Sequence, residues 1–75
     1  MKLYGFSRSS AAFRVRIGLN LKGFQWESVN VNLPEGDQFS DQYLGINPQG
    51  RVPTLIDGDT VLYQSMAILE YLDEI

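Results

Sequence analysis

The chain has 75 residues, a formal net charge of −3, and neither cysteine nor histidine. A chain this short forms one domain that buries only about 60% of the surface its unfolded form exposes, and no disulfide can reinforce its core. The missing residue types exclude a Ser-His-Asp triad, a Cys-His pair and a zinc site of nitrogen and sulfur ligands, so we expect no metal site.

No apolar run approaches the roughly 20 residues that span a bilayer. The first ten residues lack the apolar core of a signal peptide. We therefore expect a cytoplasmic protein without a membrane partner. An acidic balance without a recurring basic stripe also argues against a nucleic-acid partner.

Charge is distributed unevenly along the chain. Every basic residue except Arg51 lies within the first 22 positions, and every acidic residue lies at or after Glu27. The N-terminal third is therefore locally cationic, which suits a small anionic ligand. The alternative for Arg14 and Arg16 is a solvated helix face.

In the first half of the chain, one segment has two interpretations. Residues 2–6 (KLYGF) predict a buried strand, and residues 26–33 (WESVNVNL) alternate as a second strand. Residues 10–22 between them fit both the strand period and the helix period. Gly23 suits a helix end, and a crossover helix completes a right-handed βαβ unit, so we predict a helix over 10–22. Its broad apolar face would contain Ala11, Phe13, Val15, Ile17, Leu19 and Leu21.

The second half predicts a short helix, a hairpin and a final helix. Residues 37–46 have Phe39, Tyr43 and Ile46 at helical spacing, and 46–50 is a loop by composition. Two β-rich runs, 52–56 and 60–63, surround an Asp57-Gly58 turn, where we give Asp57 and Asp59 a turn role. Residues 64–75 predict a helix with Ser65 as its N-cap. Its apolar side would contain Met66, Ile68, Leu69, Tyr71 and Leu72. The order β-α-β-α-β-β-α predicts an α/β fold with a small mixed sheet.

Three short features could form a site. Ser9 and Ser10 precede a helix, whose N-terminus is an anion site that would lower the pKa of a ligand thiol; plain capping is the alternative. Val52-Pro53 opens a strand, and a cis bond there would expose the backbone of Val52 to a peptide-like ligand. Gln64-Ser65 begins the last helix and could bind a carboxylate or simply cap it.

Together these residues resemble the N-terminal domain of the glutathione transferases, and within them the zeta class, the maleylacetoacetate isomerases. The resemblance covers essentially the whole chain and rests on RSSAAFRVRIGLNLKG (8–23), NPQGRVPTL (47–55) and YQSMAILEYLDE (63–74). It implies a thioredoxin-like fold with a four-stranded sheet and a cis peptide at Pro53.

The resemblance also implies that the chain is a glutathione-binding domain, spanning residues 1–75, with glutathione as its cofactor. The implied contacts are Ser9, Ser10 and the amide of Ala11 for the thiolate, the backbone of Val52 beside Pro53 for the cysteinyl unit, Gln64 and Ser65 for the γ-glutamyl carboxylate, and Gln38. Ser9 and Ser10 would be the catalytic residues, and Ser10 is slightly favoured because it is nearer the helix. Ala11 departs from the Ser-Ser-Cys of many members, so hydroxyl and backbone donors would have to activate the thiol.

The implied activity is glutathione-dependent cis–trans isomerisation of a small dicarboxylate or other electrophile, a step of aromatic amino acid catabolism. Arg8 and Arg14 are candidates for attracting that substrate. The family continues into an all-helical domain that this chain does not include, and the resemblance implies a homodimer for the full-length protein. Alternatives are a stand-alone thioredoxin-like binding module without catalysis, or another zeta-type activity: maleylpyruvate isomerisation, dehalogenation or general conjugation.

Overall fold

All 75 residues are described by the structure, a computed structural model. The chain forms β1 (Lys2–Gly5), α1 (Ser10–Leu21), β2 (Glu27–Asn30), a 3₁₀ turn (Asp37–Phe39), α2 (Asp41–Ile46), β3 (Thr54–Asp57), β4 (Thr60–Tyr63) and α3 (Ser65–Glu74). This order confirms the predicted β-α-β-α-β-β-α arrangement. No helix has the length and apolar character needed to cross a membrane.

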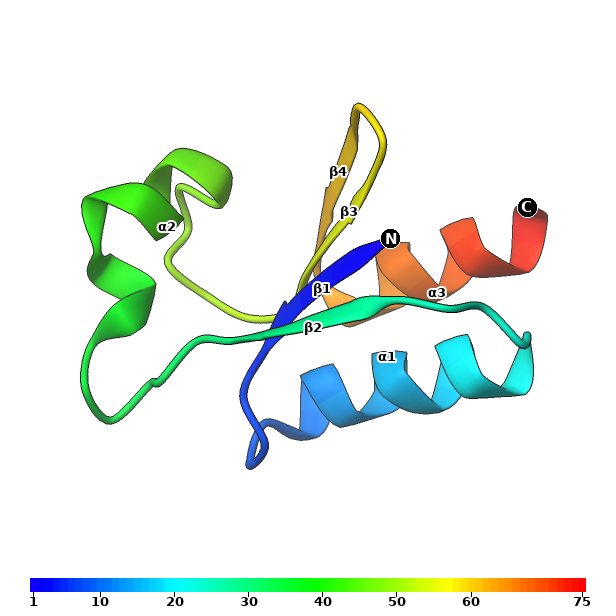
Figure 1. Cartoon of the computed structure of the whole chain (residues 1–75), viewed down its shortest axis with the longest axis horizontal. Coiled ribbons are helices and arrows are strands. Elements are labelled where there is room, and N and C mark those ends of the chain that lie inside the picture. The colour runs from blue at the N-terminus through cyan, green and yellow to red at the C-terminus, as the bar shows by residue number, and fades with distance from the viewer.

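The four strands form one mixed sheet in the order β2-β1-β3-β4. Strand β1 is parallel to β2 and antiparallel to β3, and β3 is antiparallel to β4. Ser10–Leu21 form the helix α1, which connects the parallel strands β1 and β2. The helical interpretation of residues 10–22 is therefore confirmed. Figure 1 shows α1 and α3 side by side against one face of the sheet, with α2 beyond the strands on the other side.

Strand alternation decides which helix each side chain of the sheet meets. Leu3 and Leu55 are cross-strand partners and face the core beneath α1 and α3. Tyr4 and Thr54, one position along, face the opposite way toward α2. The fully buried cluster on the α1–α3 side is Leu3, Val15, Leu19, Leu55, Ile68 and Leu72.

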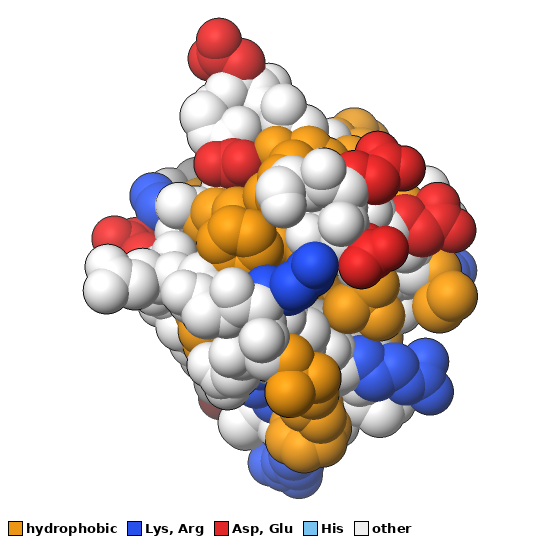
Figure 2. Space-filling model, turned by 90° about the vertical axis from the view of Figure 1, so that its right-hand side faces the viewer, with side chains coloured by type: hydrophobic (Ala, Val, Ile, Leu, Met, Phe, Trp, Pro, Cys, Tyr) orange, Lys and Arg blue, Asp and Glu red, His pale blue; other side chains and the backbone are white.

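Helix α1 is amphipathic, but its apolar face is narrower than the sequence predicts. Ala12, Val15 and Leu19 are buried, whereas Phe13, Ile17 and Leu21 are 54%, 43% and 82% exposed. Met66 of α3 is likewise exposed, against expectation. The apolar residues of α1 extend around much of the helix, but the sheet covers only one side of it, so the apolar residues on the other sides stay exposed. Figure 2 views the molecule from the C-terminal ends of α1 and α3, where hydrophobic patches alternate with charged side chains.

Two glycines have clear structural roles in this layer. Gly23 follows Lys22, the C-cap of α1, and adopts φ 73°, which confirms it as the left-handed helix stop. An added Cβ at Gly18 would come within 2.6 Å of Leu69 Cδ2. Glycine at position 18 therefore permits the close approach of α3 to α1.

Several element boundaries differ from the predictions. The segment 37–46 divides because Ser40 caps α2, accepting a hydrogen bond from the Tyr43 N–H at 3.2 Å. The second strand ends at Asn30, since the backbone beyond Val31 no longer follows β1. The hairpin is centred on Gly58-Asp59, and Asp57 closes β3. Its carboxylate also accepts a 2.7 Å hydrogen bond from the Tyr71 hydroxyl, which ties the hairpin to α3.

Replacement of Leu19 by alanine should show how strongly this small core depends on α1. Leu19 is fully buried, so Leu19→Ala should lower the free energy of unfolding by about 2–5 kcal/mol through lost burial and a cavity. Leu21→Ala, on the same helix but exposed, should change it by less than about 0.5 kcal/mol. Urea unfolding followed by circular dichroism measures both; equal effects would contradict this placement of the core.

Candidate functional site

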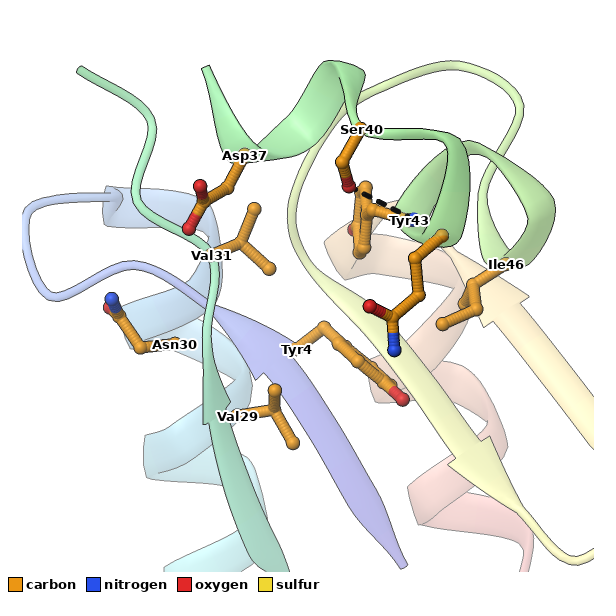
Figure 3. A pocket seen from close by; sticks show the side chains of 9 residues that line it. Tyr4, Val29, Asn30, Val31, Asp37, Ser40, Tyr43 and Ile46 are labelled. Atoms are coloured by element: carbon orange, nitrogen blue, oxygen red, sulfur yellow. Dashed lines mark hydrogen bonds between the residues drawn. The ribbon is translucent and has the colours of Figure 1, made fainter. Parts of the chain in front are cut away.

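Two cavities differ in the predicted residues that they contain. The smaller, about 230 Å³, is lined by Ala11, Asn47, Gln49, Arg51, Val52, Pro53, Gln64 and Ser65. The larger, about 300 Å³, lies between α2 and the β1–β2 strands and contains none of the predicted site residues (Figure 3). The smaller cavity, where the loop before β3 meets the first turns of α1 and α3, is therefore the candidate site.

The N-terminus of α1 contributes unused backbone donors to this region. Ser9 is the N-cap, and its Oγ accepts a 3.2 Å hydrogen bond from the Ala12 N–H. The amides of Ser10 and Ala11 take part in no hydrogen bond within the chain. Of these residues only Ala11 lines the cavity, while the Ser9 and Ser10 side chains lie outside its lining. The positive end of the α1 dipole therefore lies beside the cavity.

The N-terminus of α3 lies at the same cavity and corrects one prediction. Gln64, not Ser65, occupies the N-cap position, and no side chain caps this helix. Gln64 has φ 68° and ψ 131°, the one non-glycine residue with positive φ. Such a conformation costs about 1–3 kcal/mol and persists where surrounding structure imposes it, often at functional sites. It leaves Ser65 as the first helical residue, with a backbone amide that no group of the chain uses.

The loop between the two helix ends presents a free section of main chain. The Val52–Pro53 peptide bond is cis, as the resemblance implied. Val52 lies before β3, and neither its N–H nor its C=O is hydrogen-bonded within the chain. Since Val52 lines the cavity, one donor and one acceptor are available there for an extended ligand.

A buried polar network holds this loop in place. The Tyr43 hydroxyl and the Asn47 side-chain amide both donate to the carbonyl oxygen of Arg51, the latter at 3.0 Å. Asn47 also donates to Thr54 Oγ1 at 3.1 Å, and Thr54 Oγ1 lies 2.8 Å from the Tyr43 hydroxyl. Because Tyr43 gives its only proton to Arg51, Thr54 is the donor in that last bond. Asn47 Oδ1 accepts from the Gln49 N–H at 2.9 Å, so every polar group of the network is satisfied.

Three lining residues are not among the predicted ligand contacts, and three predicted contacts, Ser9, Ser10 and Gln38, lie outside the lining. Asn47, Gln49 and Arg51 stand within NPQGRVPTL (47–55), which supports the resemblance, but no ligand contact is predicted for their side chains. Arg51 is the one charged residue in the lining; its position directly before Val52-Pro53 was the available signal. Gln38 does not line the cavity, and its Oε1 is buried without a hydrogen-bond partner.

Replacement of Tyr43 by phenylalanine tests the network. Tyr43→Phe removes one donor and one acceptor from buried partners, so the free energy of unfolding should fall by about 1–3 kcal/mol. Tyr4→Phe removes a hydroxyl that has no partner in the chain and should have little effect. Urea unfolding of both variants makes the comparison, and equal losses would contradict a special role for the Tyr43 hydroxyl.

Tyr43→Phe should also change how the free energy of unfolding depends on pH in the alkaline range. Burial raises the pKa of Tyr43 above its usual 10.0, although a hydrogen bond from Thr54 opposes the shift. A raised folded pKa means that the folded state keeps its proton while the unfolded state loses it, so stability falls once the pH exceeds about 10. Tyr43→Phe should therefore show a shallower loss of stability than the parent above that pH, measured by urea unfolding at stepwise higher pH.

Comparison with known proteins places the chain among characterised relatives. A sequence model of the family "Glutathione S-transferase, N-terminal domain" matches residues 1–74. A zeta-class glutathione S-transferase of Euphorbia esula is 57% identical over 74 residues, which are 99% of this chain and 33% of that protein. The maleylpyruvate isomerase of Ralstonia sp. is 47% identical over 74 residues, which are 99% of this chain and 35% of that protein.

Among solved structures, maleylacetoacetate isomerase from Methylobacterium extorquens AM1, crystallised with bound malonate and GSH, superposes with a TM-score of 0.96. The two sequences are 59% identical, and the match covers 99% of this chain and 35% of the isomerase chain. The likeness confirms the predicted thioredoxin-like fold. The chain spans about a third of the length of the relatives it matches.

Proposed function

Because the chain belongs to the glutathione S-transferase N-terminal domain family, we propose that it binds glutathione in the cavity between α1, α3 and the loop before β3. The observation that carries this proposal is the convergence of unused amides at two helix N-termini and the unpaired main chain of Val52 on one cavity. Glutathione is a tripeptide with two carboxylates and a thiol. It therefore needs main-chain partners and sites that stabilise negative charge.

Each part of the ligand has a chemically suitable partner in the proposed pose. The backbone N–H and C=O of Val52 pair with the cysteinyl unit, as in the addition of a short β-strand. The unused amide of Ser65 and the Gln64 side chain receive the γ-glutamyl carboxylate, where the helix dipole favours an anion. Arg51, which the sequence did not indicate, supplies a positive charge for the other carboxylate.

The thiol would lie at the N-terminus of α1, where its ionised form is stabilised. The free amides of Ser10 and Ala11 donate to a thiolate, and the dipole contributes about half a positive charge. We favour Ser9 over Ser10 as the hydroxyl donor. The Ser9 Oγ is held in one orientation by the Ala12 N–H, and accepting that bond polarises its own O–H toward donation.

The reaction that we propose is cis–trans isomerisation by addition and elimination. The thiolate adds to a carbon–carbon double bond conjugated to a carbonyl, the resulting single bond rotates, and the thiolate leaves to give the trans isomer. Glutathione is returned unchanged. The domain's contribution is a set of preorganised donors for the thiolate. Arg8 and Arg14, both exposed, would attract a dicarboxylate substrate toward this end of the domain.

The substrate is proposed as a small cis-dicarboxylate, of the maleylacetoacetate or maleylpyruvate type. Relatives named for each of these two activities are about half identical to this chain: 51% for the maleylacetoacetate isomerase of Pseudomonas aeruginosa and 47% for the maleylpyruvate isomerase. Assay of the protein containing this chain with both substrates distinguishes the two.

Glutathione titration of the protein that contains this chain tests the binding proposal. Arg51→Gln should weaken binding about three- to tenfold by removing one charge-assisted contact. The matched control Lys22→Gln removes an equal charge from the Lys22–Asp73 ion pair, where α1 ends, and should leave affinity unchanged. Isothermal calorimetry measures all three proteins. No heat at millimolar glutathione for the parent protein would refute the proposal.

Separate alanine substitutions distinguish the two serines. Ser9→Ala should raise the pKa of the bound glutathione thiol and reduce isomerisation at neutral pH, whereas Ser10→Ala should leave that pKa nearly unchanged. The ultraviolet absorbance of the thiolate, followed against pH at saturating glutathione, reports this pKa directly. The reverse order of effects would assign the role to Ser10.

A further inference from the structure

The larger cavity is a concave space separate from the proposed glutathione site. It holds about 300 Å³, at the lower end of the range for small-molecule pockets, and shares no lining residue with the smaller cavity. Figure 3 shows its construction: Val29 from β2, Val31 just beyond the end of that strand and Tyr4 from β1 form one wall, and Ser40, Tyr43 and Ile46 close it from the α2 side.

The walls of this cavity suit an aromatic group. Val29, Val31 and Ile46 provide apolar surface, and Tyr4 contributes its ring. The Tyr4 and Tyr43 rings lie 5.8 Å apart at 53°, a tilted arrangement to which a third ring can be added at favourable distances. A single six-membered ring with a short side chain is compatible with the volume.

Charge at the cavity is of one sign. Asp37 is the only charged residue in the lining, and no lysine or arginine occurs between Asn30 and Gly50. Asp37 Oδ2 accepts a 2.9 Å hydrogen bond from the Asn32 N–H, while Oδ1 has no partner. Neither ion pair of the chain involves Asp37. The carboxylate therefore offers a free acceptor and an uncompensated negative charge.

We propose that this cavity is a second ligand site, which binds a small molecule consisting of an aromatic ring linked to a primary ammonium group. The ring would pack between Tyr4, Val29 and Ile46, and the ammonium would reach Asp37. The faces of the tyrosine rings attract a cation as well. An anion such as glutathione or a dicarboxylate is disfavoured by the same carboxylate, so the two cavities select ligands of opposite charge.

Three probes of similar shape and different charge test the selectivity. Isothermal calorimetry of the protein containing this chain should detect binding of 2-phenylethylammonium at millimolar concentration. The neutral 2-phenylethanol should bind about three- to fivefold more weakly, the size of effect expected of one partly exposed ion pair. The anionic 3-phenylpropanoate should give no measurable heat. Equal binding of all three probes, or of none, would overturn the proposal.

A charge substitution identifies the group that selects the cation. Asp37→Asn keeps an oxygen for the Asn32 N–H but removes the charge, so it should weaken the ammonium probe about three- to fivefold and leave the alcohol unchanged. Asp59→Asn, on the exposed hairpin turn, removes the same charge elsewhere and should have no effect. An equal effect of both variants would mean that overall charge, not this cavity, attracts the probe.

A space-filling substitution locates the binding. Val29→Phe should fill the cavity and abolish binding of the ammonium probe, while Val61→Phe, on β4 and 41% exposed, should not. Circular dichroism confirms that both variants are folded. Glutathione affinity should remain unchanged in Val29→Phe, so loss of this site and failure of the glutathione proposal are separate outcomes. Retained probe binding in a folded Val29→Phe variant would overturn the proposal.

Discussion

The carbonyl oxygen of Arg51 accepts hydrogen bonds from two buried side chains, and the shape of the site depends on this arrangement. Tyr43 and Asn47 are 4% and 1% exposed, so their polar groups have no water to replace a lost partner. Because the Arg51 carbonyl oxygen accepts two hydrogen bonds, the peptide group that follows Arg51 is held in one orientation. Val52, the next residue, is thus presented to the cavity with its own N–H and C=O unused.

The position of this loop matters because two helices begin beside it. Each helix leaves its first N–H groups without intrahelical partners, and at Ala11 and Ser65 these groups lie at the cavity lined by Val52. Unused N–H groups at one helix N-terminus are found in every helix and would not by themselves indicate a ligand site. Two such N-termini, with the unpaired N–H and C=O of Val52 beside the same cavity, give the donors and the acceptor on which the glutathione proposal rests.

Helix α2 connects this surface to the other cavity. The Tyr43 hydroxyl reaches the loop at Arg51, whereas its ring stands beside Tyr4 in the wall of the larger cavity. Strand alternation accounts for the arrangement: Tyr4 and its cross-strand partner Thr54 face α2 together, and their neighbours Leu3 and Leu55 face the core on the opposite side. A single buried tyrosine thereby contacts both regions, although the two cavities have no lining residue in common.

The sequence by itself determined the order of the elements, the hairpin and the helix over residues 10–22, because turn residues and periodicity are local signals. Through a resemblance that covers the whole chain, it also predicted one site that includes Ser9 and Ser10, with Ser10 slightly favoured, together with Val52 and Gln64. Only the tertiary structure decided that Gln64 rather than Ser65 takes the N-cap position, that Phe13 remains exposed, and that Arg51 joins the site lining. The reason is physical. Burial and hydrogen-bond partners depend on which segments pack together in the folded chain, and periodicity along the sequence does not specify those contacts.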